Sequence, residues 1–427
     1  MKKILKFTAI IVLLLFVFGC SGQKPKDGTV VVWHWMTDRK DAFLELAKKY
    51  QAETGVTVEF KLLFPPETYS MKVTAGARAK TLPDIFGILG EKKTVGSFIR
   101  AKHISDLTSD MTADSKTWQK RFYPQTLDVV VFKKNNYSGV KPGIYGVPID
   151  TTVMQFVYNK SLLNDLGLPG PPETFEDFIN YANRVKEKEK TFGFVCGWGE
   201  GWLLNALATE WAINLMGEKK FLSTLEGSVS YTDPDWIKVF SLFETLRNSG
   251  ILSPNIATMT NKESENAFSK GKALFSFNGS WSMNVYAQLN PELNYGFFSL
   301  PKVSKNYPVK VWGGSGTSFM VNDRSPNKDK AIEFLKWLTK KEQQIFLIKE
   351  TNNLPAIKGC EDQMSERLKK LTLNLNNLTH PDVWPGNEDS RVIESLNRGL
   401  QQIVMGLKKP QEVAKEVQEK KDKIVKR

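Results

Sequence analysis

The pattern of apolar and polar positions changes period repeatedly after residue 28. Runs of β-branched and aromatic residues are typical of buried strands, and three such runs follow one another at 29–35, 56–60 and 83–89. Between them lie two amphipathic helical patterns, 41–54 and 69–80. Strands that alternate with helices in this way predict a parallel sheet with helices on its faces.

A second α/β unit begins near residue 145. A strand is expected over 154–158, and a turn then leads into a helix whose predicted N-cap is Thr174. Asp177 stands three residues later, in the place of the usual glutamate of a capping box. Apolar spacing predicts further helices at 203–216, 234–248, 262–270, 327–349, 390–406 and 411–425. The predicted fold class is therefore α/β throughout.

The first 20 residues have the anatomy of a secretory signal. Lysines precede an apolar run from Ile10 to Phe18, and Cys20 follows. The run is too short to span a bilayer, which needs about 20 apolar residues. Val17-Phe18-Gly19-Cys20 resembles the lipobox of a bacterial lipoprotein, which implies removal of a signal peptide at 1–19 and lipidation of Cys20. Residues 20–28 are polar and predict a tether. A plain N-terminal membrane anchor is the alternative.

Composition is that of a soluble globular protein large enough for two or three domains. The 427 residues are 41% hydrophobic and 25% charged. The net charge is +13, but basic and acidic residues are interleaved, which favours a solvated surface over a nucleic-acid partner. His34, His103 and His380 are isolated, and no CxxC occurs, so no metal or other cofactor is expected. The sequence does not decide whether Cys196 and Cys360 form a disulfide.

Several short motifs carry a resemblance, and they occur in one order along nearly the whole chain. They are Leu82-Pro83-Asp84-Ile85-Phe86, Tyr145-Gly146-Val147-Pro148-Ile149, Val157-Tyr158-Asn159-Lys160, Pro172-Glu173-Thr174-Phe175, Ala267-Phe268-Ser269-Lys270-Gly271-Lys272-Ala273, Asn278-Gly279-Ser280-Trp281 and Ser325-Pro326-Asn327-Lys328. In this order the chain resembles the extracellular solute-binding proteins of bacterial ABC importers, in the carbohydrate-binding family typified by maltose-binding protein.

The resemblance implies two α/β lobes joined by a hinge, with ligand bound between them. It implies an N-terminal lobe of 29–148 and 314–355 and a C-terminal lobe of 149–312 and 358–427. The chain would cross between the lobes near 148–152, 310–314 and 354–358. The implied function is to bind a sugar outside the cytoplasmic membrane and deliver it to an ABC permease with its ATPase. A monomer, anchored through Cys20 at the cell envelope, is expected.

The chemistry of sugars agrees with the 11 tryptophans of the chain, because flat rings cover the apolar faces of a pyranose and polar groups bind its hydroxyls. Trp281 matches the tryptophan of the family's Asn-Gly-x-Trp turn. Trp35 ends the first strand and is the next candidate for a ligand contact. Trp33, two residues earlier on the same strand, is the alternative candidate. The candidate ligand-binding residues are Trp35, Asp38, Arg39, Glu91, Lys92, Asp150, Glu200, Trp202, Trp281 and Trp312.

The chain also departs from the family's pattern. Maltose-binding protein has a glutamate where Thr152 stands and an aromatic residue where Ile88 stands, and Trp384 is only a loose match to its C-terminal tryptophan. A site tuned to the same oligosaccharide is therefore not expected. Polyols, glycerol phosphate esters and peptides are alternative ligand classes. A surface adhesin that binds a sugar without delivering it to an importer is an alternative function.

An enzyme is the alternative from another class. A secreted glycoside hydrolase needs two carboxyl groups roughly 5–10 Å apart. Glu91, Asp150 and Glu200 are the carboxylates available for it. No nucleophile motif, metal signature or phosphate loop accompanies them, so the sequence favours a binding protein without catalytic residues.

Overall fold

The computed structural model describes residues 28–90, 92–134, 136, 138–187, 191–383 and 387–425. The predicted signal peptide, Cys20 and the predicted tether up to residue 27 lie outside these residues. Glu91 and Trp384 lie outside them as well, so the structure says nothing of these two candidates.

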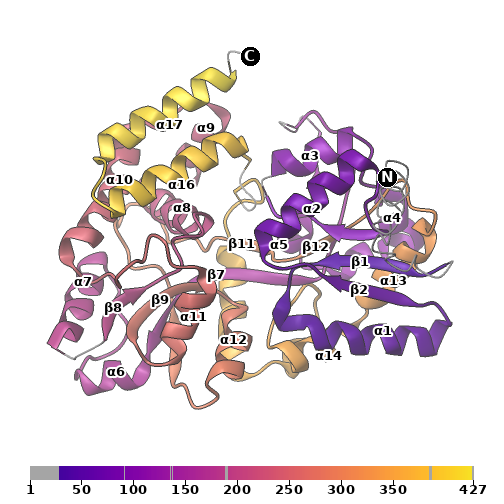
Figure 1. Cartoon of the computed structure of the whole chain (residues 1–427), viewed down its shortest axis with the longest axis horizontal. Coiled ribbons are helices and arrows are strands. Elements are labelled where there is room, and N and C mark those ends of the chain that lie inside the picture. Colours follow the sequence, from indigo (N-terminus) through magenta and orange to yellow (C-terminus); the bar gives the residue numbers. More distant parts are fainter. Residues whose placement is uncertain are drawn as a thin grey trace, which may run out of the picture.

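The chain folds into two α/β lobes, each with its own sheet (Figure 1). The sheet of the first lobe has the order β2-β1-β3-β12-β6. Its first three strands are parallel, as predicted, whereas β12 runs antiparallel to both of its neighbours, β3 and β6, so the sheet is mixed. The bounds are β1 Val30–His34, β2 Val58–Leu62, β3 Ile85–Gly87, β6 Val147–Pro148 and β12 Ser318–Val321.

The sheet of the second lobe has the order β10-β7-β9-β8. Strand β7 is antiparallel to both neighbours, and β8 is parallel to β9. The prediction of a two-lobed α/β fold is confirmed. The bounds are β7 Asp150–Asn159, β8 Phe192–Val195, β9 Ala273–Gly279 and β10 Tyr295–Phe298.

Strand β7 runs from one lobe into the other, as Figure 1 shows. Val153 packs in the core of the first lobe, while Met154 and Phe156 pack in the core of the second. Two short strands, β11 (Gly313–Ser315) and β13 (Leu354–Pro355), pair with the first half of β7. Three segments distant in sequence therefore lie side by side where the lobes join.

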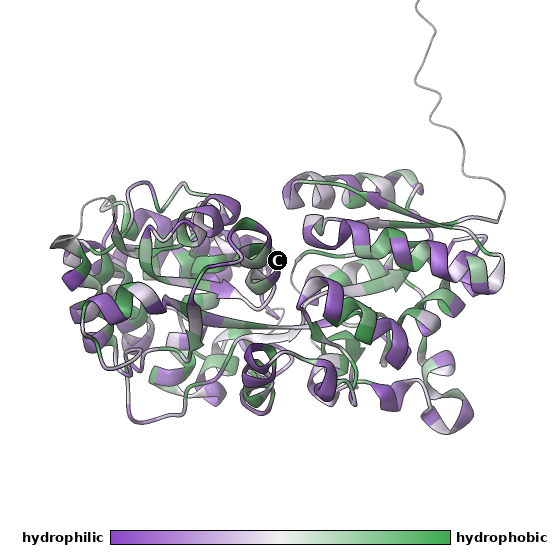
Figure 2. Cartoon of the chain, turned by 90° about the horizontal axis from the view of Figure 1, so that it is seen from below, coloured by the Kyte–Doolittle hydropathy of each residue, from purple (hydrophilic) through white to green (hydrophobic). Residues whose placement is uncertain are grey.

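Helices cover both sheets. In the first lobe they are α1 Lys40–Thr54, α2 Pro66–Ala79, α3 Lys92–Arg100, α4 Thr108–Lys116, α5 Pro124–Leu127, α13 Lys328–Leu338, α14 Lys341–Thr351 and α15 Glu366–Thr372. In the second lobe they are α6 Lys160–Asp165, α7 Phe175–Asn183, α8 Trp202–Met216, α9 Glu218–Glu226, α10 Pro234–Ser249, α11 Asn261–Ser269, α12 Ser282–Leu289, α16 Ser390–Val404 and α17 Pro410–Val425. Figure 2 shows hydrophobic residues gathered inside each lobe and hydrophilic residues on the outward helix faces.

The predicted N-cap of α7, Thr174, is confirmed. The hydroxyl of Thr174 accepts a hydrogen bond from the backbone N–H of Asp177 at 3.1 Å and caps α7. The single helix expected over 327–349 is wrong, because α13 and α14 are separated at Thr339. That side chain is fully buried and accepts a hydrogen bond from the indole N–H of Trp118 at 2.9 Å.

The segment 358–378 lies in the first lobe rather than the second. Cys360, Leu368 and Leu371 are buried in the core that contains β1 and β12. Cys196 is buried in the core of the second lobe, and both cysteines are free thiols, so they form no disulfide with each other. Among the described residues, no helix has both the length and the apolarity needed to cross a bilayer.

Candidate ligand-binding site

Trp281 lies two residues after the end of β9 and immediately before α12 begins. Its indole N–H donates to the Oε1 atom of Glu265 at 3.1 Å. The ring lies so close to Gly279 that a Cβ there would approach it within 1.9 Å, which requires glycine at that position. The side chain is only half buried. The ring is thus fixed at one edge and keeps part of its surface open.

Glu265 is the residue that the sequence did not single out. It is fully buried on α11 and accepts hydrogen bonds from the side-chain amides of Asn261, at 3.0 Å, and Asn278, at 3.2 Å. Lys262 pairs with its other oxygen at 2.9 Å. With the indole of Trp281, this carboxylate gathers four donors, and it holds the end of β9 against α11.

Trp202 and Glu200 lie beside Trp281. The ring centroids of Trp202 and Trp281 are 5.8 Å apart with a tilt of 50°. The indole N–H of Trp202 donates to Oε2 of Glu200 at 3.1 Å, and Oε1 accepts from the backbone N–H of Asn261 at 2.8 Å. Glu200 therefore orients Trp202 and caps the start of α11. Both tryptophans have their only donor bound to a carboxylate, so each offers its ring face.

Asp38, Arg39 and Asp150 form a second group at the junction of the lobes. The guanidinium of Arg39 pairs with Asp150 and lies 3.5 Å from the carboxylate of Asp38. Burial opposes the charge of Arg39, but the two carboxylates outweigh burial and raise its pKa. The backbone N–H of Thr317 donates to Asp150 at 2.5 Å. Arg39 and Asp150 are 5% and 3% exposed, so this pair fixes the loop after β1 to β7 and leaves little surface for a ligand.

Helix α12 connects the two groups. The side-chain amide of Asn284 donates to the backbone carbonyl of Asp38 at 3.0 Å. Because Asn284 lies one turn after Trp281, the tryptophan pair and the loop after β1 belong to one neighbourhood that spans both lobes.

Two candidates, Lys92 and Trp312, contact neighbouring residues of one short segment, Asp382 and Val383. The ammonium of Lys92, on α3 of the first lobe, pairs with Asp382 at 3.0 Å. The indole N–H of Trp312 donates to the carbonyl of Val383 at 2.8 Å. Trp312 is 7% exposed and packs in the core of the second lobe, so it supports the site from behind rather than covering a ligand.

Behind Trp312 lies Glu210, whose carboxylate accepts the backbone N–H of Trp312 at 2.8 Å. Burial raises the pKa of Glu210 well above its ordinary value, and the hydrogen bond from Trp312 only partly opposes this. This buried acid was not predicted either, since its helix is apolar on every face and gives no periodic signal around it.

Trp35 is half buried, and its ring is tilted on Tyr69 with the centroids 4.9 Å apart. The hydroxyl of Tyr69 bonds both the N–H and the carbonyl of Gly87, at 2.8 and 2.9 Å, which ties α2 to β3 beneath Trp35. Trp33 is half buried as well and lies under the ammonium of Lys72 at 5.4 Å. Trp198, in contrast, is fully buried.

Two of the three carboxylates considered for a glycoside hydrolase bind protein donors. Asp150 is bound to Arg39 and Thr317, and Glu200 is bound to Trp202 and Asn261. Each acts as an acceptor for protein donors, which is a structural role. The third candidate, Glu91, lies outside the described residues.

Comparisons with known proteins agree with this fold. A multiple sugar-binding protein of Streptococcus mutans is 25% identical over 270 residues, which cover 61% of this chain and 64% of that protein. The melibiose/raffinose/stachyose-binding protein of Bacillus subtilis is 24% identical over 346 residues, 77% of this chain and 75% of the relative. A solved structure from work on xylan utilization by the thermophilic bacterium Caldanaerobius polysaccharolyticus has a TM-score of 0.80 at 20% identity, covering 92% of this chain and 99% of that one.

Two lobes joined by three side-by-side segments, with half-exposed tryptophans where they meet, define a protein that holds a small solute. Residues 34–345 match the bacterial extracellular solute-binding protein family. The chain belongs to this family.

Proposed function

We propose that this protein binds an oligosaccharide outside the cytoplasmic membrane and delivers it to the permease of an ABC importer with its ATPase. The observation that carries the proposal is the pair Trp202 and Trp281, 5.8 Å apart, with both indole N–H groups bound to carboxylates. Rings fixed in this way present flat apolar surfaces, which match the C–H faces of a pyranose.

Polar groups where the lobes meet complement those rings. Lys92 and Asp382 form a partly exposed ion pair between the lobes, and Asp38 lies beside the tryptophan neighbourhood through Asn284. Such groups exchange hydrogen bonds with sugar hydroxyls. The names of the relatives support the same ligand class, since two of them bind sugars by name.

Location follows from the N-terminus. Cys20 carries the lipid in this proposal, and the polar residues after it tether a monomer to the outer face of the membrane. The tether leaves the lobes free to meet a permease in the same membrane.

Calorimetric titration with melibiose, raffinose and stachyose tests the ligand class, with glycerol and glycerol 3-phosphate as the non-sugar alternatives. One of the sugars should bind, and Trp281→Ala and Trp202→Ala should each weaken it by about 30-fold, the loss typical of an aromatic hot spot. Tyr307→Ala removes an exposed ring elsewhere in the second lobe and should leave affinity unchanged. Binding of glycerol 3-phosphate alone would overturn the sugar assignment.

A further inference from the structure

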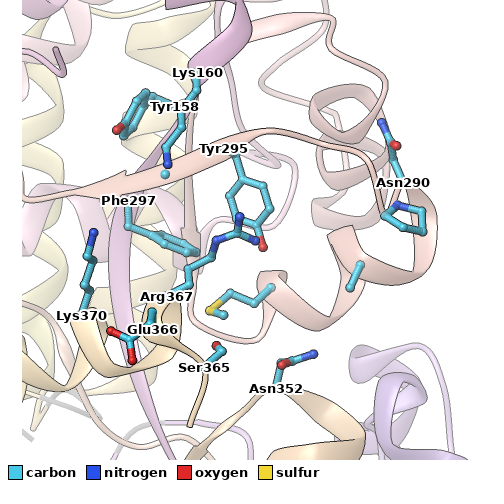
Figure 3. Close-up of a pocket in the computed structure, with 14 residues that line it drawn as sticks. Tyr158, Lys160, Asn290, Tyr295, Phe297, Asn352, Ser365, Glu366, Arg367 and Lys370 are labelled. Atoms are coloured by element: carbon cyan, nitrogen blue, oxygen red, sulfur yellow. The ribbon is translucent and has the colours of Figure 1, made fainter.

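A cavity of about 500 Å³ lies apart from the tryptophan neighbourhood, and none of the ten candidate residues lines it (Figure 3). Its walls come from the end of β7, the first residue of α6 (Lys160–Asp165), strand β10, helix α12 with the turn that follows it, helix α15 with the residue before it, and the residue after α14.

The lining combines aromatic rings with positive charge. Three cations line the cavity, namely Lys160, Arg367 and Lys370, and three rings lie among them, namely Tyr158, Tyr295 and Phe297. The one acid in the lining, Glu366, pairs instead with Lys369, outside the cavity, at 2.8 Å. Within the part of the chain that the structure describes, no carboxylate forms an ion pair with any of the three cations.

Arg367 is already oriented toward the cavity. Its guanidinium carbon lies 4.1 Å from the centre of the Tyr295 ring, a cation–π contact. Figure 3 shows Arg367 reaching from α15 to Tyr295 on β10, with Phe297 next to it. Tyr295 is 3% exposed, so the ring that receives the guanidinium is firmly packed.

The two sides of this contact belong to different lobes. Leu368 and Leu371 fix α15 in the core of the first lobe. Tyr295 pairs with Asn159 across the sheet of the second lobe. A molecule in the cavity therefore contacts both lobes at once, on a surface that the tryptophan neighbourhood does not use.

We propose that this cavity is a second binding site, for a small organic anion with a flat apolar portion, such as an aromatic phosphate or carboxylate. The cations bind the anionic group through charge-assisted hydrogen bonds, and the rings cover the apolar portion. The proposal does not depend on sugar binding, because it uses none of the residues assigned to the sugar.

Phenyl phosphate is the probe, with phenol as its uncharged counterpart and inorganic phosphate as the anion without a ring. By calorimetry at low ionic strength, phenyl phosphate should bind with one site per chain, at least tenfold tighter than inorganic phosphate, and phenol should not bind. No heat with phenyl phosphate at millimolar concentration, or equal affinity for phosphate, would overturn the proposal.

Variants locate the site. Arg367→Ala should weaken phenyl phosphate at least tenfold, and so should Lys160→Ala, which removes a cation contributed by the other lobe. Arg398→Ala is the matched control, since it removes the same residue type from an exposed position on α16, where its partner Glu394 does not line the cavity, and it should leave affinity unchanged. If Arg398→Ala and Arg367→Ala lose the same affinity, the effect comes from net charge alone and the site is refuted. Circular dichroism spectra establish that each variant is folded.

Discussion

At the scale of single residues, the orientation of Trp281 depends on one buried carboxylate. Glu265→Ala removes the acceptor of the indole N–H and leaves two asparagine amides without their partner. Sugar affinity should fall about tenfold or more although Glu265 touches no ligand, and unpaired buried donors cost about 1–3 kcal/mol of folding stability each. Glu265→Gln keeps an acceptor and should retain most of the affinity.

Calorimetry measures the sugar affinity and the thermal stability of both Glu265 variants, and tryptophan fluorescence reports on the environment of the Trp281 ring. Together they distinguish a loss of ring orientation from a loss of folding. The positioning role is wrong if Glu265→Ala remains folded and binds sugar as the unaltered protein does.

His34 makes stability depend on pH. Burial, aided by the charge of Arg39 and opposed by Asp38, lowers the pKa of His34 from 6.5 to about 4. Below pH 6.5 the unfolded chain therefore binds a proton that the folded chain does not, and stability is lost as the pH falls from 6.5 toward 4. The full loss is about 3 kcal/mol, at 1.36 kcal/mol per unit of pKa.

His34→Phe tests this, because the imidazole already lies edge-on to Phe43 and Phe60, at 5.1 and 5.8 Å. The melting temperatures of the two proteins should diverge between pH 6.5 and 4, with the variant less sensitive to acid. Parallel curves over that range would show that His34 does not carry the effect.

Residues whose role follows from local sequence could be predicted, and residues whose role follows from tertiary packing could not. Thr174 caps its helix because the acceptor and donor are three residues apart. Glu265 stands in a helix rich in polar residues and looks solvated, yet it is fully buried because β9 and α12 pack over it. Arg39 and Asp150 were predicted as ligand contacts, but they pair with each other, and a pairing across 111 positions gives no local signal.

At the scale of elements, the link between the lobes depends on close approach of backbones. A Cβ on Gly313 would lie 2.4 Å from the carbonyl oxygen of Thr152, across the β11–β7 pairing. Gly313→Ala should therefore push β11 away from β7 and destabilise the protein by about 1–3 kcal/mol, as overpacking does. Gly170→Ala is the control, since no heavy atom lies within 4 Å of the added methyl group.

Chemical denaturation compares the two alanine variants. Equal stability would mean that β11 pairs with β7 less tightly than the structure shows.

Hydrophobic periodicity predicted most helices and the first three strands, but it carries no information on partners. It therefore missed the antiparallel strand β12 and its pairing with β3 and β6 in the first sheet. It also merged α13 and α14, because Thr339 interrupts the backbone without interrupting the apolar spacing. The segment 358–378 was assigned to the wrong lobe because chain order alone does not show which core receives Leu368 and Leu371.

At the scale of the whole molecule, the proposed anchor sets where the protein works. Cys20→Ser removes the thiol that would carry lipid, and a single change should then move the protein from the membrane fraction to the soluble fraction. Fractionation with mass measurement of the mature N-terminus tests this. Membrane retention of the variant, together with an unmodified mass for the original protein, would contradict the lipoprotein assignment.

The joint between the lobes predicts how the whole molecule responds to sugar. Three adjacent segments, β7, β11 and β13, connect the lobes, while side-chain contacts such as Lys92 with Asp382 and Asn284 with Asp38 cross between them. A sugar must be enclosed from both sides for its hydroxyls to exchange water for protein partners, so binding favours the closed arrangement.

Saturation with the bound oligosaccharide should therefore reduce the radius of gyration in solution scattering. The Trp281→Ala variant, measured at a sugar concentration at which the variant binds no sugar, should keep the same radius of gyration with and without sugar. If the scattering of the unaltered protein is the same with and without sugar while calorimetry shows the site full, the lobes do not close, and the joint acts as a rigid support.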